Sequence, residues 1–273
     1  MGIFDGIILA SDLDGTLLDS NGEISRENLD AIEFFKREGG LFAIVTGRMP
    51  YYASDIYHRA RSNAPLCCMN GGAIYDIAQG KYLWQSELDT SVKELLQFAD
   101  ANFARVGFCI NTYDKVYFGK ENTVMQFFRD ITGLPDLPCD YETFGEPMAK
   151  VVFGVETEEE MEAISCALRS HPLADRFKLV RSERYLFEVL PGGISKGVGL
   201  TKLAECLGID MSKTVAVGDY NNDIELIESA GVGIAVANAC DELKAVADRI
   251  TVSNDEHAIA KIIEDIYNKN IIM

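Results

Sequence analysis

Residues 6–16 of the chain read Gly-Ile-Ile-Leu-Ala-Ser-Asp-Leu-Asp-Gly-Thr. The apolar run at 6–10 predicts a buried strand, and Asp12 and Asp14 follow it directly. Two carboxylates this close repel each other unless a cation lies between them or one of them stays protonated. Ligands of open α/β sheets bind at the carboxyl ends of the strands. The stretch therefore predicts a nucleophilic aspartate with a metal ion and an acid/base partner.

Two other interpretations of this motif remain open at this point. Asp and Gly are common in turns, so an Asp-x-Asp-Gly string also fits an ordinary loop. A calcium-binding loop begins with Asp-x-Asp too, but it needs Gly at its sixth position and Glu at its twelfth. Here Gly15 is the fourth residue, and Glu23 is the twelfth with the non-acidic Thr16 at the fifth. A strand rather than a helix before the motif also disfavours the calcium loop.

The composition is that of a globular protein with one or two domains: 273 residues, 48% hydrophobic and 25% charged. The net charge of −18 disfavours nucleic acid and membrane surfaces as partners, although a metal and a few cations can still attract an anionic substrate. Seven cysteines without a Cys-x-x-Cys pair predict reduced thiols in a cytoplasmic protein. We expect no signal peptide and no membrane span, because no apolar run approaches ~18 residues.

Strands and helices alternate in the first and last parts of the chain. Strands are predicted at 6–10, 41–45 and 66–69, and helices at 26–38 and 50–61, the first with Ser25 as its N-cap. The alternation resumes after Ser195. Such alternation implies right-handed βαβ units and a parallel sheet. We predict an α/β fold with a Rossmann-like parallel-sheet core formed by residues 1–84 and 190–273.

The pattern changes in the middle of the chain, where we predict an inserted cap at residues 85–189. A hairpin is predicted after Gly72, and further on short strands occur in pairs with interspersed helices, for example strands at 106–111 and 115–118 and a helix at 158–170. This pattern is typical of an antiparallel α+β module. The simplest account is one parallel-sheet domain interrupted by an inserted α+β cap.

Polar residues follow the second predicted strand and open the helix after the insertion. Thr46-Gly47-Arg48 offers a hydroxyl and backbone amides that can hold an anion, although a plain Thr N-cap fits as well. Ser195-Lys196-Gly197 places a cation where it could neutralise a phosphate, although alone Lys196 also fits a solvated surface residue.

A further polar group follows the strand predicted at 214–217. Residues 218–223 read Gly-Asp-Tyr-Asn-Asn-Asp, which puts Asp219, Asn222 and Asp223 at the end of this strand and at the start of a helix. Helix capping by Asn or Asp explains one of these residues but not the whole group. The joint occurrence of these polar strand ends favours a phosphate-handling site.

These motifs resemble the haloacid dehalogenase (HAD) superfamily of aspartate-nucleophile phosphohydrolases. Within it, the similarity is to the Cof-like type IIB sugar-phosphate phosphatases, which carry an α/β cap between the second and third motifs. The resemblance spans the whole chain. Its motifs are Asp-Leu-Asp-Gly-Thr at 12–16, Thr-Gly-Arg at 46–48, Asn-Gly at 70–71, Ser-Lys-Gly at 195–197, Gly-Asp-x-x-Asn-Asp at 218–223 and the stretch 230–239.

The resemblance implies a two-step phosphoryl transfer with Mg²⁺ as cofactor. The ion would be held by a carboxylate oxygen of Asp12, the backbone carbonyl of Asp14 and the carboxylate of Asp219, with Asp223 in its shell. Asp12 would attack phosphorus and form an aspartyl-phosphate. Asp14 would protonate the leaving alkoxide and then activate the hydrolytic water.

The resemblance also implies a set of phosphate-binding residues. Thr46, the backbone amides of Leu13 and Gly47, and Lys196 would bind the equatorial phosphate oxygens. Asn222 would orient the phosphate or the lysine. Closure of the cap would exclude water and add contacts to the substrate.

The expected partner is a small phosphorylated metabolite, because a cap favours small substrates over phosphoproteins. We expect a cytoplasmic monomer that binds neither nucleic acid nor membranes. Two alternatives remain. A phosphotransferase such as a phosphomutase would pass the phosphoryl group to a sugar hydroxyl instead of water. A non-catalytic phosphometabolite sensor would keep the metal site, but it would have no need of the acid/base residue Asp14.

Overall fold

The computed structural model describes residues 2–271, which form two compact units. The first unit comprises the described residues of Met1–Gln85 and Ser195–Met273, and the second comprises Ser86–Ile194. The expected end of the cap at residue 189 falls inside strand β10 (Leu186–Pro191), which pairs with β9 along its whole length. The chain therefore leaves the second unit only after this strand has ended.

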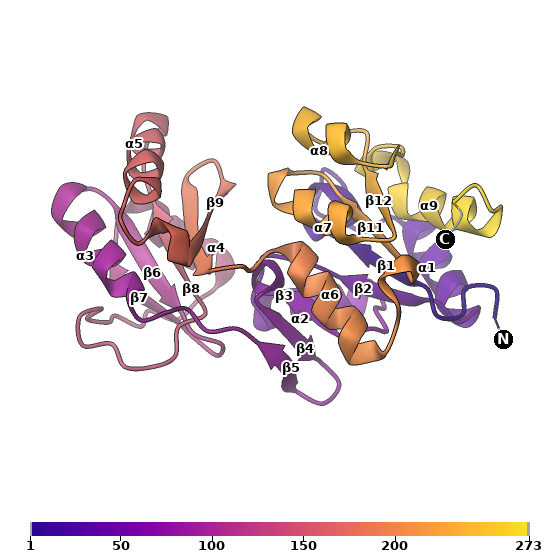
Figure 1. Ribbon diagram of the computed structural model, residues 1–273, viewed down its shortest axis with the longest axis horizontal. Helices are drawn as coiled ribbons and strands as arrows, with labels where there is room; N and C mark the ends of the chain where they lie inside the picture. The colour runs from indigo at the N-terminus through magenta and orange to yellow at the C-terminus, as the bar shows by residue number, and fades with distance from the viewer. Residues whose placement is uncertain (1, 272–273) are drawn as a thin grey trace. The chain divides into compact units, whose positions relative to one another are not determined.

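The first unit is built on a parallel sheet with the strand order β13-β12-β11-β1-β2 (Figure 1). Its strands are β1 (Ile8–Ser11), β2 (Leu41–Ile44), β11 (Thr214–Gly218), β12 (Val232–Ala235) and β13 (Arg249–Ile250). Every residue of β1 is buried, as an unbroken apolar run predicts for a central strand covered on both faces. The predicted α/β class with a parallel-sheet core is confirmed.

The register of the sheet decides where polar residues emerge. Ser11 at the end of β1 lies opposite Val217 of β11 and Ile44 of β2. Strands β11, β1 and β2 therefore end level with one another. Asp12 and Gly218, the neighbours of the paired residues, come out at the same edge.

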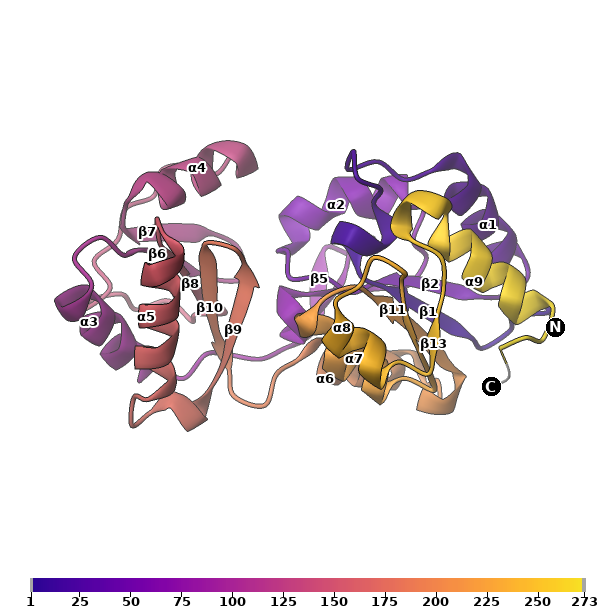
Figure 2. The ribbon, with the colours of Figure 1, turned by 90° about the horizontal axis from the view of Figure 1, so that it is seen from above.

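Helices pack on both faces of this sheet. Figure 2 shows α1 and α9 together on one face and α6 and α7 on the other. Ser25 caps α1 as predicted, because its hydroxyl accepts the Asn28 backbone N–H at 3.2 Å. The helices of this unit are α1 (Arg26–Arg37), α2 (Pro50–Arg59), α6 (Lys196–Leu207), α7 (Ile224–Ser229), α8 (Asp241–Val246) and α9 (Ala258–Tyr267).

Strand β3 (Leu66–Cys68) departs from the prediction. The alternating pattern predicts it as a further strand of the parallel sheet, but one isolated bridge, from Val45 to Cys67, joins it in parallel. It instead forms a separate antiparallel sheet with β4 (Ala73–Asp76) and β5 (Lys81–Gln85). The turn Met69–Gly71 reverses the chain directly after β3 and so pairs this strand with β4 in antiparallel orientation.

The second unit is an antiparallel sheet with helices, as the α+β prediction expected. Its strand order is β7-β6-β8-β10-β9. Helices α3 and α5 pack on a core that includes the fully buried rings of Phe108, Phe153 and Phe187. Its elements besides β10 are α3 (Val92–Asn102), β6 (Gly107–Asn111), β7 (Val116–Lys120), α4 (Thr123–Thr132), β8 (Lys150–Gly154), α5 (Glu158–Arg169) and β9 (Phe177–Glu183).

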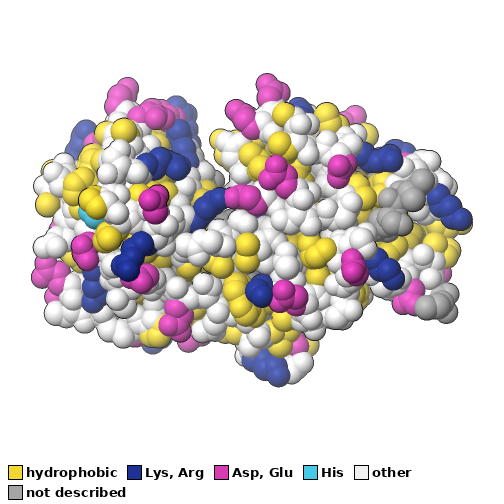
Figure 3. All heavy atoms as spheres, in the orientation of Figure 1, with side chains coloured by type: hydrophobic (Ala, Val, Ile, Leu, Met, Phe, Trp, Pro, Cys, Tyr) yellow, Lys and Arg dark blue, Asp and Glu magenta, His cyan; other side chains and the backbone are white. Residues whose placement is uncertain are grey.

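Acidic and basic side chains are interspersed over the face of the molecule shown in Figure 3. Within residues 2–271, none of the helices combines the length and the apolar character that crossing a membrane requires.

Candidate active site

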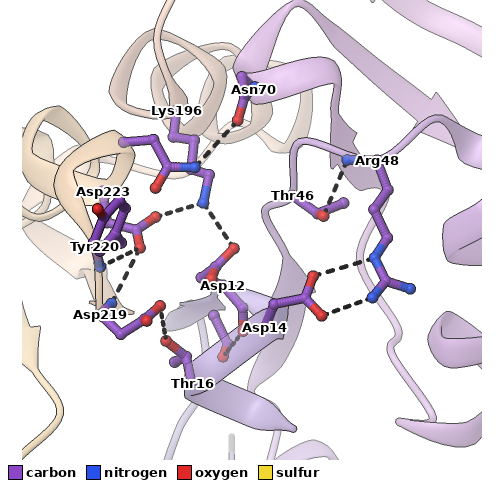
Figure 4. A network of polar contacts seen from close by, with 12 residues as sticks. Asp12, Asp14, Thr16, Thr46, Arg48, Asn70, Lys196, Asp219, Tyr220 and Asp223 are labelled. Atoms are coloured by element: carbon purple, nitrogen blue, oxygen red, sulfur yellow. Dashed lines mark hydrogen bonds and ion pairs between the residues drawn. The ribbon is translucent and has the colours of Figure 1, made fainter. Parts of the chain in front are cut away.

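The carboxyl edge of the parallel sheet brings together three acidic residues from distant parts of the sequence (Figure 4). Asp12 follows β1, and its backbone N–H donates to the Val217 carbonyl of β11 at 3.0 Å. Asp219 follows β11, and Asp223 ends the turn before α7. In the described part of the chain, these three residues each place a carboxylate oxygen within 4.8 Å of the other two. Aligned strand ends thus produce a compact acidic group.

Lys196 neutralises part of this charge. It is the first residue of α6, which Ser195 caps, and its side chain is 1% exposed. Its Nζ donates to Oδ1 of Asp12 at 2.7 Å and to Oδ1 of Asp223 at 2.6 Å. The interpretation of Lys196 as a solvated surface cation is therefore wrong.

The pKa values reflect burial and crowding of like charges. Burial raises the pKa of Asp12 well above its ordinary value, and Asp223 adds to this while Lys196 opposes it. Burial alone would lower the pKa of Lys196, but the two carboxylates outweigh it and raise that pKa. Burial, followed by Asp223, raises the pKa of Asp219 from 3.8 to about 6. The site thus holds more negative charge than one ammonium neutralises.

Close packing fixes the Asp219 carboxylate. Its Oδ1 accepts the Thr16 hydroxyl at 3.1 Å. Gly15 has φ +79°, and a Cβ at this position would lie 2.4 Å from Oδ2 of Asp219, so only glycine permits this approach. Oδ2 of Asp223 accepts the backbone N–H groups of Asp219 and Tyr220 at 3.1 and 3.3 Å. Asp223 therefore holds the loop that carries Asp219.

The chemistry of these donors fits a hard divalent cation. Carboxylate oxygens are the ligands that Mg²⁺ and Ca²⁺ prefer. Both oxygens of Asp223 already accept hydrogen bonds, from Lys196 and from the backbone. Asp12 and Asp219 are thus the side chains best placed to coordinate an ion, with Asp223 supporting them. The surplus negative charge would favour the binding of such a cation.

Asp14 lies apart from this acidic group. Its side chain is 63% exposed and forms a two-point ion pair with Arg48, with Nη2 to Oδ1 at 2.7 Å and Nε to Oδ2 at 3.2 Å. The outward side chain is compatible with the expected metal ligand at this position, which is the backbone carbonyl. Arg48 belongs to the Thr46-Gly47-Arg48 motif, but the sequence alone assigns it no role. Its position just after a strand end could have indicated that it lies near Asp14.

The expected phosphate-binding residues lie on four segments of the first unit. Thr46 is buried, and its hydroxyl accepts the Arg48 backbone N–H at 3.2 Å. Leu13 lies in the turn after Asp12. Asn222 donates from its side chain to Oδ1 of Asn70 at 3.4 Å. Lys196 reaches the acidic group itself, as described above.

A family model described as haloacid dehalogenase-like hydrolase matches residues 9–263. The chain belongs to this family. It is 30% identical to the 5-amino-6-(5-phospho-D-ribitylamino)uracil phosphatase YitU of Bacillus subtilis, over 96% of this chain and 97% of that protein. The predicted resemblance is confirmed, and the chain is an enzyme of the HAD-like hydrolases.

Solved structures have the same fold. A haloacid dehalogenase-like hydrolase from Bacteroides thetaiotaomicron has a TM-score of 0.83 at 25% identity, covering 95% of this chain and 99% of that one. The HAD subclass IIB sugar phosphatase BT4131 has a TM-score of 0.80 at 23% identity, covering 97% and 100% of the two chains. The fold of this HAD-like hydrolase therefore matches that of a type IIB phosphatase over nearly its whole length.

Replacing Lys196 by Met should strongly destabilise the metal-free protein, because it leaves buried carboxylates without their counter-charge. We expect a loss of about 3–5 kcal/mol in the free energy of unfolding at pH 7.5, measured in urea with EDTA present. The loss should shrink as the pH falls, because protonation removes the unpaired charges. Lys202→Met, on a partly exposed lysine of the same helix, should change stability little, and equal effects of the two variants would contradict the assignment.

Divalent cations and protons should compete at Asp219. Since its pKa is raised to about 6, the metal-free fold loses stability as the pH rises from about 4 to about 6, and a bound cation offsets this loss above that range. Mg²⁺ should therefore raise the melting temperature more at pH 7.5 than at pH 5, and this gain should shrink in Asp219→Asn. A Mg²⁺ effect that is the same at both pH values would contradict this competition.

Proposed function

We propose that this HAD-like hydrolase is a Mg²⁺-dependent phosphatase of small phosphorylated metabolites, such as sugar phosphates, that works through an aspartyl-phosphate on Asp12. One observation carries the proposal. The Asp12 carboxylate lies at a strand end between a buried ammonium on one side and a further carboxylate on the other. This is the setting that a carboxylate nucleophile needs beside a cation and a phosphate dianion.

The first step forms a bond between an oxygen of Asp12 and phosphorus while the bond from phosphorus to the leaving oxygen breaks. Asp14 gives its proton to that leaving oxygen, which departs as an alcohol. In the second step Asp14 takes a proton from water, whose oxygen attacks phosphorus and releases Asp12 and inorganic phosphate. Mg²⁺, when bound, supplies positive charge that screens the nucleophile from the phosphate.

The other residues bind and orient. Thr46, the backbone amides of Leu13 and Gly47, and Lys196 hold the phosphate oxygens, over which charge spreads in the transition state. Arg48 fixes the position of the Asp14 carboxylate through its two-point ion pair.

We infer that the second unit, Ser86–Ile194, selects the substrate. The sequence predicts this unit at residues 85–189. Two of the similar Bacillus subtilis proteins are named for the dephosphorylation of 5-amino-6-(5-phospho-D-ribitylamino)uracil. This compound therefore joins hexose phosphates in the first set of substrates to test. The seven free cysteines support work in a reducing compartment, and we propose the cytoplasm and a monomeric enzyme.

Asp12→Asn should abolish phosphate release, lowering kcat by at least about 10⁴-fold, because an amide cannot act as the nucleophile. The measurement is release of inorganic phosphate from p-nitrophenyl phosphate and the substrates named above, with Mg²⁺ or with EDTA. Asp30→Asn, on an exposed aspartate of the same unit, should leave the rate unchanged.

Asp14→Asn should also lose about 10²–10⁴-fold in kcat while it still binds Mg²⁺, because its side chain serves as acid and base but does not ligate the ion. Near wild-type turnover in this variant would remove the acid/base role. If wild-type enzyme transfers the phosphoryl group to a sugar hydroxyl instead, the enzyme is a phosphotransferase. Binding of phosphorylated compounds without any turnover would identify a sensor.

Arg48→Met should lower kcat by about 10²-fold, because Asp14 loses the partner that holds its carboxylate in place. Arg26→Met removes a guanidinium from an exposed surface pair and serves as the control with unchanged kcat. Steady-state phosphate release measures both variants. An Arg48→Met enzyme with wild-type kcat would show that the ion pair has no part in turnover.

A further inference from the structure

The turn after β3 contains an unusual run of backbone conformations. Met69, Asn70 and Gly71 have φ values of +56°, +54° and +87°. Glycine adopts this left-handed region freely, but a side chain makes it unfavourable, and Asn tolerates it better than Met does. Such strain persists only where the surroundings enforce it, and it occurs preferentially at functional sites.

Backbone hydrogen bonds connect this turn to the Thr46-Gly47-Arg48 loop. The Asn70 N–H donates to the Thr46 carbonyl at 3.0 Å, and the Met69 N–H donates to the Arg48 carbonyl at 3.1 Å. Two adjacent left-handed residues thus direct both of their N–H groups to the loop proposed to hold the phosphate.

The side chain of Asn70 packs between two further parts of the site. The residue is 3% exposed. A Cβ on Gly47 would lie 2.9 Å from Oδ1 and 3.1 Å from Nδ2 of Asn70, so the amide lies directly against the Gly47 backbone. Oδ1 of Asn70 also accepts the Asn222 side chain at 3.4 Å.

Gly71 brings the same turn against the start of α6. A Cβ on Gly71 would lie 2.0 Å from the Ser195 carbonyl oxygen and 3.0 Å from Cα of Lys196. This close approach fixes where the helix that carries the lysine begins. Figure 4 shows the neighbouring residue Asn70 beside Lys196. The turn therefore contacts the Thr46–Gly47 loop, Asn222 and the start of α6, which are three of the parts proposed to hold the phosphate.

We propose that Asn70 is a positioning residue, whose left-handed backbone and buried amide hold the Thr46–Gly47 loop, Asn222 and the start of α6 at the mutual distances that a phosphate requires. The inference rests on the proposed function, since it concerns the phosphate site of that reaction. The role proposed for Asn70 is exerted through the neighbours it holds, Gly47 and Asn222 among them.

The test separates the backbone of Asn70 from its amide. Asn70→Gly keeps the left-handed conformation and removes the amide, whereas Asn70→Ala removes the amide and strains the backbone as well. Binding of inorganic phosphate by the full chain is measured by calorimetry with Mg²⁺ present, and kcat and KM are measured with p-nitrophenyl phosphate. We expect Asn70→Gly to weaken phosphate binding about tenfold with a nearly unchanged melting temperature. Asn70→Ala should lower both the phosphate affinity and the melting temperature.

Asn63 provides a matched control in the same unit. Its amide holds the start of β2 by accepting the Phe42 N–H at 2.8 Å and donating to the Gly40 carbonyl at 3.1 Å. Asn63→Gly should lower the melting temperature and leave phosphate binding unchanged. A double-mutant cycle of Asn70→Gly with Asn222→Ala should show non-additive losses in phosphate affinity, and a cycle with Asn63→Gly should be additive.

Two results would overturn the inference separately from the proposed function. Wild-type phosphate affinity in Asn70→Gly would assign the turn a backbone role alone. Additive losses in the cycle with Asn222 would show that the amide does not link the two residues. A wild-type protein that neither binds nor releases phosphate would instead refute the proposed function, and the inference with it.

Discussion

The charge balance at the carboxyl edge of the parallel sheet is the constraint on which the rest of this structure depends. Asp12 and Asp223 lie buried on either side of the Lys196 ammonium, at 2.7 and 2.6 Å. A buried carboxylate without a partner is strongly unfavourable, so the lysine must reach this position for the fold to be stable. That one contact constrains the positions of several segments: the beginning of α6, the ends of β1 and β11, and the turn before α7.

The same group of residues carries a surplus of negative charge. Asp219 adds a third carboxylate to a group with one buried ammonium, and its pKa of about 6 reflects the repulsion together with burial. The surplus makes the metal-free arrangement less stable above that pH, and a divalent cation bound there would stabilise the fold. The same repulsion among the carboxylates thus destabilises the metal-free protein and would favour binding of a cation.

Much of this arrangement could be predicted from the sequence, because the relevant signals are local. The apolar run before Asp12 predicts a buried parallel strand, and the level ends of such strands bring Asp12 and Asp219 together. The burial of Lys196 could not be predicted, because it depends on packing between elements far apart in the chain. The same holds for the pair of Asp14 with Arg48, since both were visible as motif residues but their contact depends on loop conformation.

For strand β3, the sequence predicts the strand itself but not the sheet that it joins. Its composition predicts a strand correctly, but periodicity carries no information on which sheet a strand joins. The deciding feature is the left-handed turn at Met69–Gly71, which no apolar pattern reveals. Local chemistry could still have suggested it, because Asn-Gly is a pair that favours positive φ.

The division of the first unit into two segments has a consequence for synthesis on the ribosome. Asp12 and Lys196 are 184 positions apart, and all of the second unit lies between them. While the chain grows, β1 has no partner on its β11 side and Asp12 has no counter-charge. The inserted unit, once compact, brings its own two ends closer together and shortens the loop that must close. Translation order thus makes the acidic group one of the last parts of the first unit to assemble, and a chain released before residue 196 carries Asp12 without its counter-charge.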